Sequence, residues 1–242
     1  MRYAILGDIH SNLEALQEVL WELKKKDIDA YLCIGDLVGY NANPRECIEI
    51  IRGTCKQIIA GNHDWACVGK LSLAWFREIA KEAIIWTTNL LAETEKIFLS
   101  HLELVYEEED FTLVHGTLFK PEEFYYLDNL GYARRCFENL KTPLLFLGHT
   151  HKPLVFSLDH RGNLLYSFEE KIFLREEMRY IINVGSVGQP RDGDPRACFC
   201  IYDSKEKTIE WHRISYDYKK TQEKILANSL PVELAYRLSE GR

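Results

Sequence analysis

Aspartate, histidine and asparagine side chains that could bind metal ions occur in five short clusters of the sequence. The clusters are Asp8-Ile9-His10, Gly35-Asp36, Gly61-Asn62-His63-Asp64, His115-Gly116 and Gly148-His149-Thr150-His151. They contain five of the eight histidines, and structural histidines do not usually gather in this way. Carboxylate and imidazole groups bind manganese, iron, zinc, cobalt or nickel, and no cysteine belongs to the clusters, which argues against a structural thiolate site. The residue types therefore predict a site for divalent cations.

A pair of such ions would supply hydrolytic chemistry. Two divalent cations about 3.5–4 Å apart can share one carboxylate and one hydroxide, and this hydroxide is a nucleophile at neutral pH. The two aspartates, Asp8 and Asp36, cancel two of the four positive charges, whereas neutral imidazole and amide ligands cancel none. With the hydroxide, a charge of about +1 remains, and a metal pair of this charge can hold a phosphate. It could do so even in a protein whose formal net charge is −7.

Each cluster directly follows an apolar run that is typical of a β-strand, at residues 2–6, 30–34, 56–60, 111–114 and 144–147. Helical patterns separate the first three runs. One helix is expected to begin with a capping box formed by Ser11 and Glu14, and the next at Asn43 and Pro44. This alternation predicts right-handed crossovers and a parallel sheet. Open α/β folds build their sites at the strand ends of one sheet edge, so we expect the five clusters to form one site.

The rest of the chain predicts further elements around this sheet. Residues 65–103 are helical in character, with Trp75, Phe76, Ile79, Ala83 and Trp86 spaced for a buried face. A hairpin is expected at 103–114, a helix at 129–140, and short strands from 144 onward, with a turn at 159–163. The tail predicts two helices separated at Pro231. We expect one domain over 1–242, with a helical insertion at about 65–103 and a helical tail at about 217–242.

Composition narrows the functional class. No apolar run is as long as a membrane span, and the sequence starts with a strand rather than a signal peptide, so we expect a cytoplasmic protein without a membrane partner. The seven cysteines lack zinc-finger spacing and are expected to be reduced core residues. A net charge of −7 argues against binding of long nucleic acids but not against a small phosphorylated substrate. The oligomeric state stays open, and the helices at 65–103 and in the tail could bury a partner surface.

Taken in order, the five clusters resemble the signature of the calcineurin-like metallophosphoesterases over residues 8–151. Two further stretches, 35–40 and 183–192, resemble the small bacterial and archaeal phosphodiesterase branch of that superfamily. The resemblance implies an α/β fold, a four-layer αββα sandwich of two mixed β-sheets flanked by helices. It also implies a metal-dependent phosphoester hydrolase, with a phosphodiesterase favoured.

The resemblance further implies a role for each cluster residue. Asp8, His10 and His151 would bind the first of two divalent metals, Asp36 would bridge both, and Asn62, His115 and His149 would complete the second. Manganese is favoured, with iron, nickel, cobalt and zinc as alternatives. His63 would stay off the metals and protonate the leaving group, with Asp64 orienting its ring. An imidazole suits this task because its unperturbed pKa lies near working pH.

Several alternatives remain open from the sequence. Arg191 is a candidate phosphate ligand, because a guanidinium matches phosphate oxygens, but a salt bridge to Asp192 or Asp194 explains it equally well. Asp64 could also cap a helix. Tyr40 could line the substrate cleft or simply fill a polar loop.

The shared motifs also leave the substrate class open. A phosphomonoesterase, a protein phosphatase or a dinucleoside polyphosphate hydrolase would carry the same clusters. A noncatalytic binding scaffold is a further alternative, and the complete ligand set together with His63 counts against it.

Overall fold

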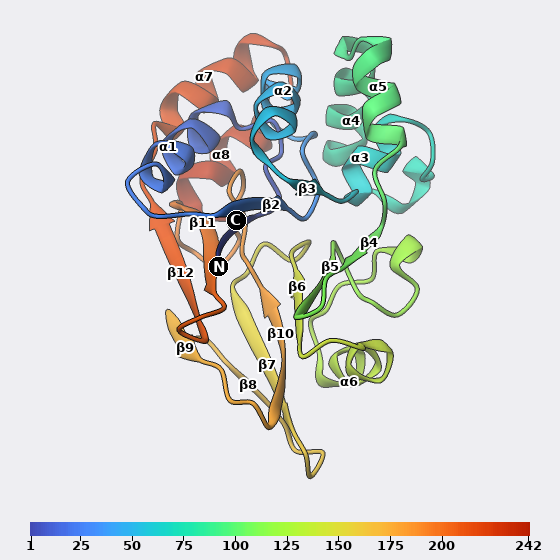
Figure 1. Cartoon of the computed structure of the whole chain (residues 1–242). Coiled ribbons are helices and arrows are strands. Elements are labelled where there is room, and N and C mark those ends of the chain that lie inside the picture. Colours follow the sequence, from blue (N-terminus) through green and yellow to red (C-terminus); the bar gives the residue numbers. More distant parts are fainter.

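The computed structural model describes residues 1–242 and contains two six-stranded sheets that face each other (Figure 1). The first sheet has the order β3-β2-β1-β11-β12-β9. Its strands are β1 (Arg2–Leu6), β2 (Ala30–Cys33), β3 (Gln57–Ile58), β9 (Lys171–Phe173), β11 (Ala197–Asp203) and β12 (Thr208–Ile214). Strands β1, β2 and β3 run parallel, whereas β11, β12 and β9 pair antiparallel. The sheet is therefore mixed, and its parallel part carries the first three clusters.

The second sheet has the order β4-β5-β6-β10-β7-β8 and is also mixed. Its strands are β4 (Val105–Glu107), β5 (Phe111–Val114), β6 (Leu144–Leu147), β7 (Leu154–Asp159), β8 (Leu164–Ser167) and β10 (Met178–Asn183). Strands β5, β6 and β10 are parallel, and the others pair antiparallel. The expected hairpins at 103–114 and around 159–163 are both present.

Alternating side chains of the strands divide the core into layers. On β11, Cys198 and Cys200 face the second sheet, where they join Phe111 and Phe146 in one buried cluster. The intervening Phe199 points to the other face and packs with the first helices. On the outer face of the second sheet, Leu145 packs against helix α6 (Leu130–Asn139). This alternation confirms the predicted sandwich of two mixed sheets between helices, and all seven cysteines are free thiols.

Two helices cover the first sheet near its parallel strands: α1 (Leu13–Leu23) and α2 (Pro44–Thr54). Proline stands at the start of α2, as expected. The predicted capping box at Ser11 is wrong by one residue, because the side chain of Asn12 accepts the backbone N–H of Ala15. Glu14 instead forms an ion pair with Lys224, which ties α1 to the C-terminal tail.

The helical segment after the third cluster consists of α3 (Asn62–Cys67), a short 3-10 turn (Leu73–Trp75), α4 (Glu78–Leu90) and α5 (Glu93–Ser100). Ala83 is buried as predicted, but Trp75 is 81% exposed. The predicted buried face fails there because the chain turns into extended backbone at Phe76, which breaks the helical spacing.

The C-terminal tail forms α7 (Tyr218–Ala227) and α8 (Val232–Glu240), which pack against each other beside α1 in Figure 1. Pro231 separates them, as predicted. Buried side chains of both helices join Tyr40 and the alanines of α4 in one apolar cluster. None of the helices combines the length and the apolar composition that a membrane span requires.

Candidate metal centre

The five clusters lie at the carboxyl ends of parallel strands from both sheets. Asp8 follows β1, Asp36 follows β2 and Asn62 follows β3, whereas His115 and His149 follow β5 and β6. Side chains of these clusters form two groups, and within each group the ligand atoms all lie within 4.8 Å of one another. One group is Asp8, His10, Asp36 and His151, and the other is Asp36, His115 and His149. Both groups are buried and share Asp36, the residue expected to bridge.

The backbone around this centre is unusual for residues other than glycine. Five of the seven predicted ligands have positive φ angles: Asp8 (51°), His10 (48°), Asp36 (51°), His149 (66°) and His151 (61°). Such angles are uncommon for non-glycine residues and cost free energy, so they persist only where the surrounding structure enforces them. Interlocking loops do so here, because His10 N–H donates to the carbonyl of Asp36 and Gly188 N–H to that of Asp8.

Hydrogen bonds to backbone carbonyls orient three of the imidazole rings. The Nδ1 atom lies 3.0 Å from the Val38 oxygen in His10, 2.8 Å from the Ile34 oxygen in His115, and 2.5 Å from the Gln189 oxygen in His151. A carbonyl only accepts, so each Nδ1 carries a proton, and in the neutral ring Nε2 presents its lone pair to the centre. This arrangement of ligand and outer hydrogen bond is typical of histidines that bind metals.

The ring nitrogens and oxygens that face the centre lie within hydrogen-bond or ion-pair distance of one another, and Nε2 of His149 has no partner. Nε2 of His10 lies 3.4 Å and that of His115 3.3 Å from Oδ2 of Asp36. Nε2 of His149 has no hydrogen-bond partner although it is buried. Oδ1 of Asn62 lies 3.2 Å from Nε2 of His115. Buried polar atoms normally find partners, so this cluster of oxygen and nitrogen donors fits divalent cations.

Burial and neighbouring charges shift the pKa values of the side chains in the two ligand groups. Burial lowers the pKa of His10, which keeps the ring neutral. Burial alone would lower the pKa of His115 too, but the carboxylate of Asp36 raises it to about 9. Burial would raise the pKa of Asp36, yet His115, His63 and His10 hold it well below its usual range. A cation at this centre would therefore have to displace a proton from His115, and metal binding would release it.

His63 lies beside the ligand groups without belonging to either. Its ring centroid is 4.8 Å from that of His10 and 4.5 Å from that of Tyr40. Its backbone N–H donates to Asp36 Oδ1 at 2.8 Å. Its Nδ1 has no hydrogen-bond partner and packs against Gly39, where a Cβ atom would come within 2.4 Å. Burial lowers the pKa of His63 to about 4, so the ring is neutral before an anion arrives.

Asp64 acts on loops rather than on the His63 ring. Its carboxylate accepts the backbone N–H groups of Leu37 and Gly61, each at 2.9 Å, and that of Val38 at 3.3 Å. It makes no hydrogen bond to His63, so the expected direct orienting contact does not form. The carboxylate accepts the N–H of Gly61, the residue that precedes α3, so Asp64 contributes to capping this helix although it is not the N-cap residue itself.

Arg191 points toward the centre, and the alternative salt bridges do not form. Its Nε and Nη2 atoms donate to Oε1 of Gln189 at 3.2 and 2.8 Å. Asp192 pairs with Arg213, and Asp194 pairs with Arg196. The guanidinium lies 5.5 Å from the ring centroid of Tyr40. Arg191 is therefore available to an anion at the mouth of the site.

Aromatic side chains that sequence reasoning missed flank the centre. The ring of Tyr126 stacks on that of His149 at 4.1 Å, and Phe76 approaches His63 edge-on at 5.2 Å. Tyr40, which the sequence left undecided, lies 4.5 Å from His10. No spacing in the sequence marks Tyr126, because its contact joins two loops that are distant along the chain.

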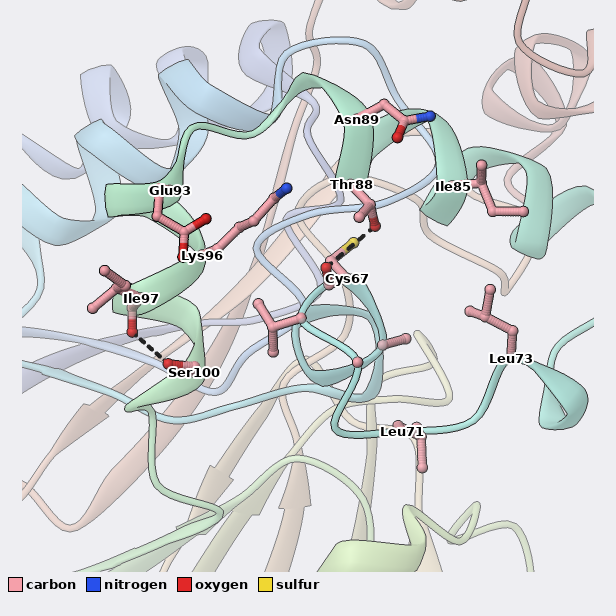
Figure 2. A pocket seen from close by; sticks show the side chains of 13 residues that line it. Cys67, Leu71, Leu73, Ile85, Thr88, Asn89, Glu93, Lys96, Ile97 and Ser100 are labelled. Atoms are coloured by element: carbon pink, nitrogen blue, oxygen red, sulfur yellow. Dashed lines mark hydrogen bonds between the residues drawn. The ribbon is translucent and has the colours of Figure 1, made fainter.

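A separate cavity of about 510 Å³ lies between α3, α4 and α5 (Figure 2). Its walls include Cys67, Leu73 and Ile97, together with Thr88, whose hydroxyl donates to the carbonyl of Cys67 at 3.2 Å. None of the predicted ligands lines it. The metal centre and this cavity are therefore distinct features of the molecule.

The fold and the cluster together define a class: α/β sandwich proteins whose strand ends can hold divalent cations. The family model described as the calcineurin-like phosphoesterase superfamily domain matches residues 1–207, and the chain belongs to this superfamily. The resemblance found in the five clusters is thereby confirmed.

Relatives and solved structures agree with this membership. An uncharacterized protein of Methanocaldococcus jannaschii is 43% identical over 249 residues, which cover 99% of this chain and 98% of its own. A metallophosphoesterase from Sphaerobacter thermophilus is 36% identical with a TM-score of 0.87, over 100% of this chain and 99% of its own. A hypothetical protein from Pyrococcus horikoshii shares the fold with a TM-score of 0.80 at 21% identity, over 100% and 98% of the two chains.

Proposed function

We propose that the protein is a dinuclear-metal-dependent phosphodiesterase that acts on a small phosphorylated molecule. The observation that carries the proposal is the sharing of Asp36 by two groups of buried ligand atoms. A carboxylate between two ions is the usual arrangement of paired hydrolytic metals. Asp8, His10 and His151 would hold the first ion, and Asn62, His115 and His149 the second. Manganese is the proposed metal, with iron, nickel, cobalt and zinc as alternatives, since carboxylate, amide and imidazole ligands suit all of them.

When bound, the two cations would neutralise charge on the phosphoryl group and generate the nucleophile from water at neutral pH. His63 would hydrogen-bond to the phosphoryl group and donate a proton to the departing alkoxide. Burial lowers the pKa of His63 to about 4, and a phosphate anion beside the ring would raise it by favouring the charged imidazolium. Asp64 would fix the Asp36 loop and the start of α3, and so position both Asp36 and His63.

The aromatic walls support a diester rather than a monoester. A diester carries an organic group on each side of phosphorus. Phe76 and Tyr40 pack beside His63, and Tyr126 stacks on His149, so apolar surface is present at both ligand groups. Tyr126 is 49% exposed and can contact a substrate group without displacing any part of the fold.

Hydrolysis of two related esters tests the proposal. The protein would be stripped of metal with a chelator, reloaded with manganese and assayed with bis-p-nitrophenyl phosphate and p-nitrophenyl phosphate. We expect no turnover after stripping, recovery on reloading, and a higher kcat/KM for the diester. A higher kcat/KM for the monoester would contradict the diesterase assignment. Absence of both bound metal and turnover would favour a noncatalytic scaffold.

A further inference from the structure

Two arginines without Asp or Glu partners, Arg191 and Arg237, flank Tyr40 beside the metal centre. A third, Arg77, directly follows Phe76, whose ring contacts that of His63. Arg191 follows the strand-end loop at Gln189, Arg237 belongs to α8, and Arg77 directly precedes α4. The guanidinium carbons of Arg191 and Arg237 lie 5.5 and 5.9 Å from the centroid of the Tyr40 ring. Other arginines of the chain, such as Arg196 and Arg213, form ion pairs with aspartates, whereas none of these three does.

The hydrogen bonds of Arg237 leave most of its donors free. Its Nε donates to the main-chain oxygen of Arg242 at 2.9 Å, and neither terminal nitrogen donates a hydrogen bond within the protein. Burial, followed by the positive charges of Arg191 and Arg77, lowers the pKa of Arg237. Neighbouring like charges repel each other, and an anion among them would relieve the repulsion. The chain has a formal net charge of −7, so these arginines form a positively charged region within an acidic protein.

Each arginine reaches the site from a different element. Arg77 follows Phe76, whose ring touches that of His63. Arg237 is carried by the tail, which the Glu14–Lys224 ion pair fixes to α1. The end of α8 is fixed to the loop after Arg191, because Gly193 N–H donates to the carbonyl of Gly241 at 3.0 Å. The tail lies beyond residues 1–207, the part that matches the superfamily domain.

We propose that Arg237, together with Arg77 and Arg191, forms a second anion site that binds a further phosphate group of the substrate. Preferred substrates would then be small phosphodiesters in which an esterified alcohol carries a second phosphate. This phosphate would be separated from the scissile phosphoryl group by about the width of the Tyr40 ring. This inference rests on the proposed function for the position of the scissile group. The tail helices would thus set substrate choice, while the strand ends supply the chemistry.

Phosphate fits this cluster better than a carboxylate. Guanidinium groups bind phosphate oxygens through two parallel N–H donors, and several guanidiniums can share its three terminal oxygens. Each charged hydrogen bond contributes on the order of 1.5–3 kcal/mol, so the loss of one arginine weakens binding roughly tenfold or more.

Equilibrium binding of two simple ligands tests the site without turnover. Manganese-loaded protein would be titrated in a calorimeter with propyl phosphate and with propane-1,3-diyl bisphosphate. We expect the bisphosphate to bind at least about tenfold more tightly to the unmodified protein, and Arg237→Gln to remove most of this advantage. Arg77→Gln lies on another element and is expected to act in the same direction. Lys219→Gln removes an exposed positive charge of the same tail and is expected to keep the advantage.

The outcomes separate the two proposals. Equal affinity for both ligands in the unmodified protein, or an unchanged ratio in both Arg237→Gln and Arg77→Gln, would overturn the second anion site. A fall in affinity for both ligands alike would also overturn it, since it would indicate a structural role. An Arg237-dependent ratio in a protein that hydrolyses no phosphoester would contradict the proposed function instead. An active enzyme that binds the bisphosphate no more tightly than propyl phosphate would contradict only the second anion site.

Discussion

The two ends of helix α3 border regions of very different character. At its start, Asn62 and His63 lie in the buried cluster at the strand ends. At its end, Ala66 and Cys67 line the cavity of about 510 Å³ that Figure 2 shows. The cavity offers space, but burial raises the pKa of the Cys67 thiol and makes it a poor nucleophile. The cluster holds unpartnered ring nitrogens and five ligands with positive φ angles.

This contrast indicates that volume alone does not locate chemistry in this molecule. Backbone in uncommon conformations and buried polar atoms without partners both cost free energy, and they occur together only at the strand ends. In the cavity lining, the Thr88 hydroxyl instead has a partner within the protein, the Cys67 carbonyl. Substitutions at the two ends of α3 should therefore have effects of very different size.

The largest expected effect follows from Asp36→Asn. Asp36 belongs to both ligand groups, so loss of its charge should weaken both metal sites at once. Metal ions contribute several kcal/mol to transition-state stabilisation, so turnover of bis-p-nitrophenyl phosphate should fall on the order of 10³-fold. Elemental analysis should show the loss of bound metal. The control is Asp27→Asn at an exposed carboxylate, which should retain both metal and turnover; full metal binding in Asp36→Asn would contradict the bridging role.

His63→Gln should have the next largest effect and should leave the metal in place. General acid catalysis contributes roughly 10²–10⁴-fold, and its contribution is greatest for leaving groups that are poor without a proton. The variant should therefore lose most turnover with an alkyl ester and least with a p-nitrophenyl ester. Kinetics over a series of leaving groups would measure this slope. His101→Gln, at an exposed histidine, should change neither turnover nor bound metal. Loss of metal in His63→Gln would indicate that His63 is a metal ligand.

Local sequence signals predicted the strand-end clusters because each motif directly follows its own strand. Such local signals do not predict contacts between segments that are distant along the chain. Nothing near Arg237 in the sequence indicates that α8 folds back to Tyr40. The resemblance implied that Asp64 orients the His63 ring, yet consecutive residues of a helix point in different directions. Asp64 therefore faces the backbone of Leu37 instead.

The smallest effect on activity should come from the other end of α3. Cys67 is 2% exposed and packs as a small apolar residue, so Cys67→Ala should lower the free energy of unfolding by about 1 kcal/mol. The start of α3 is held independently, since the Asp64 carboxylate binds the Gly61 and Leu37 backbone. We therefore expect kcat/KM for the diester to stay within about twofold, because distant, unconnected sites behave almost independently. Urea unfolding and steady-state kinetics on the same preparation would measure both quantities. A tenfold fall in kcat/KM without metal loss would mean that the cavity and the metal centre are coupled through α3, and the two ends of the helix would then be one functional unit.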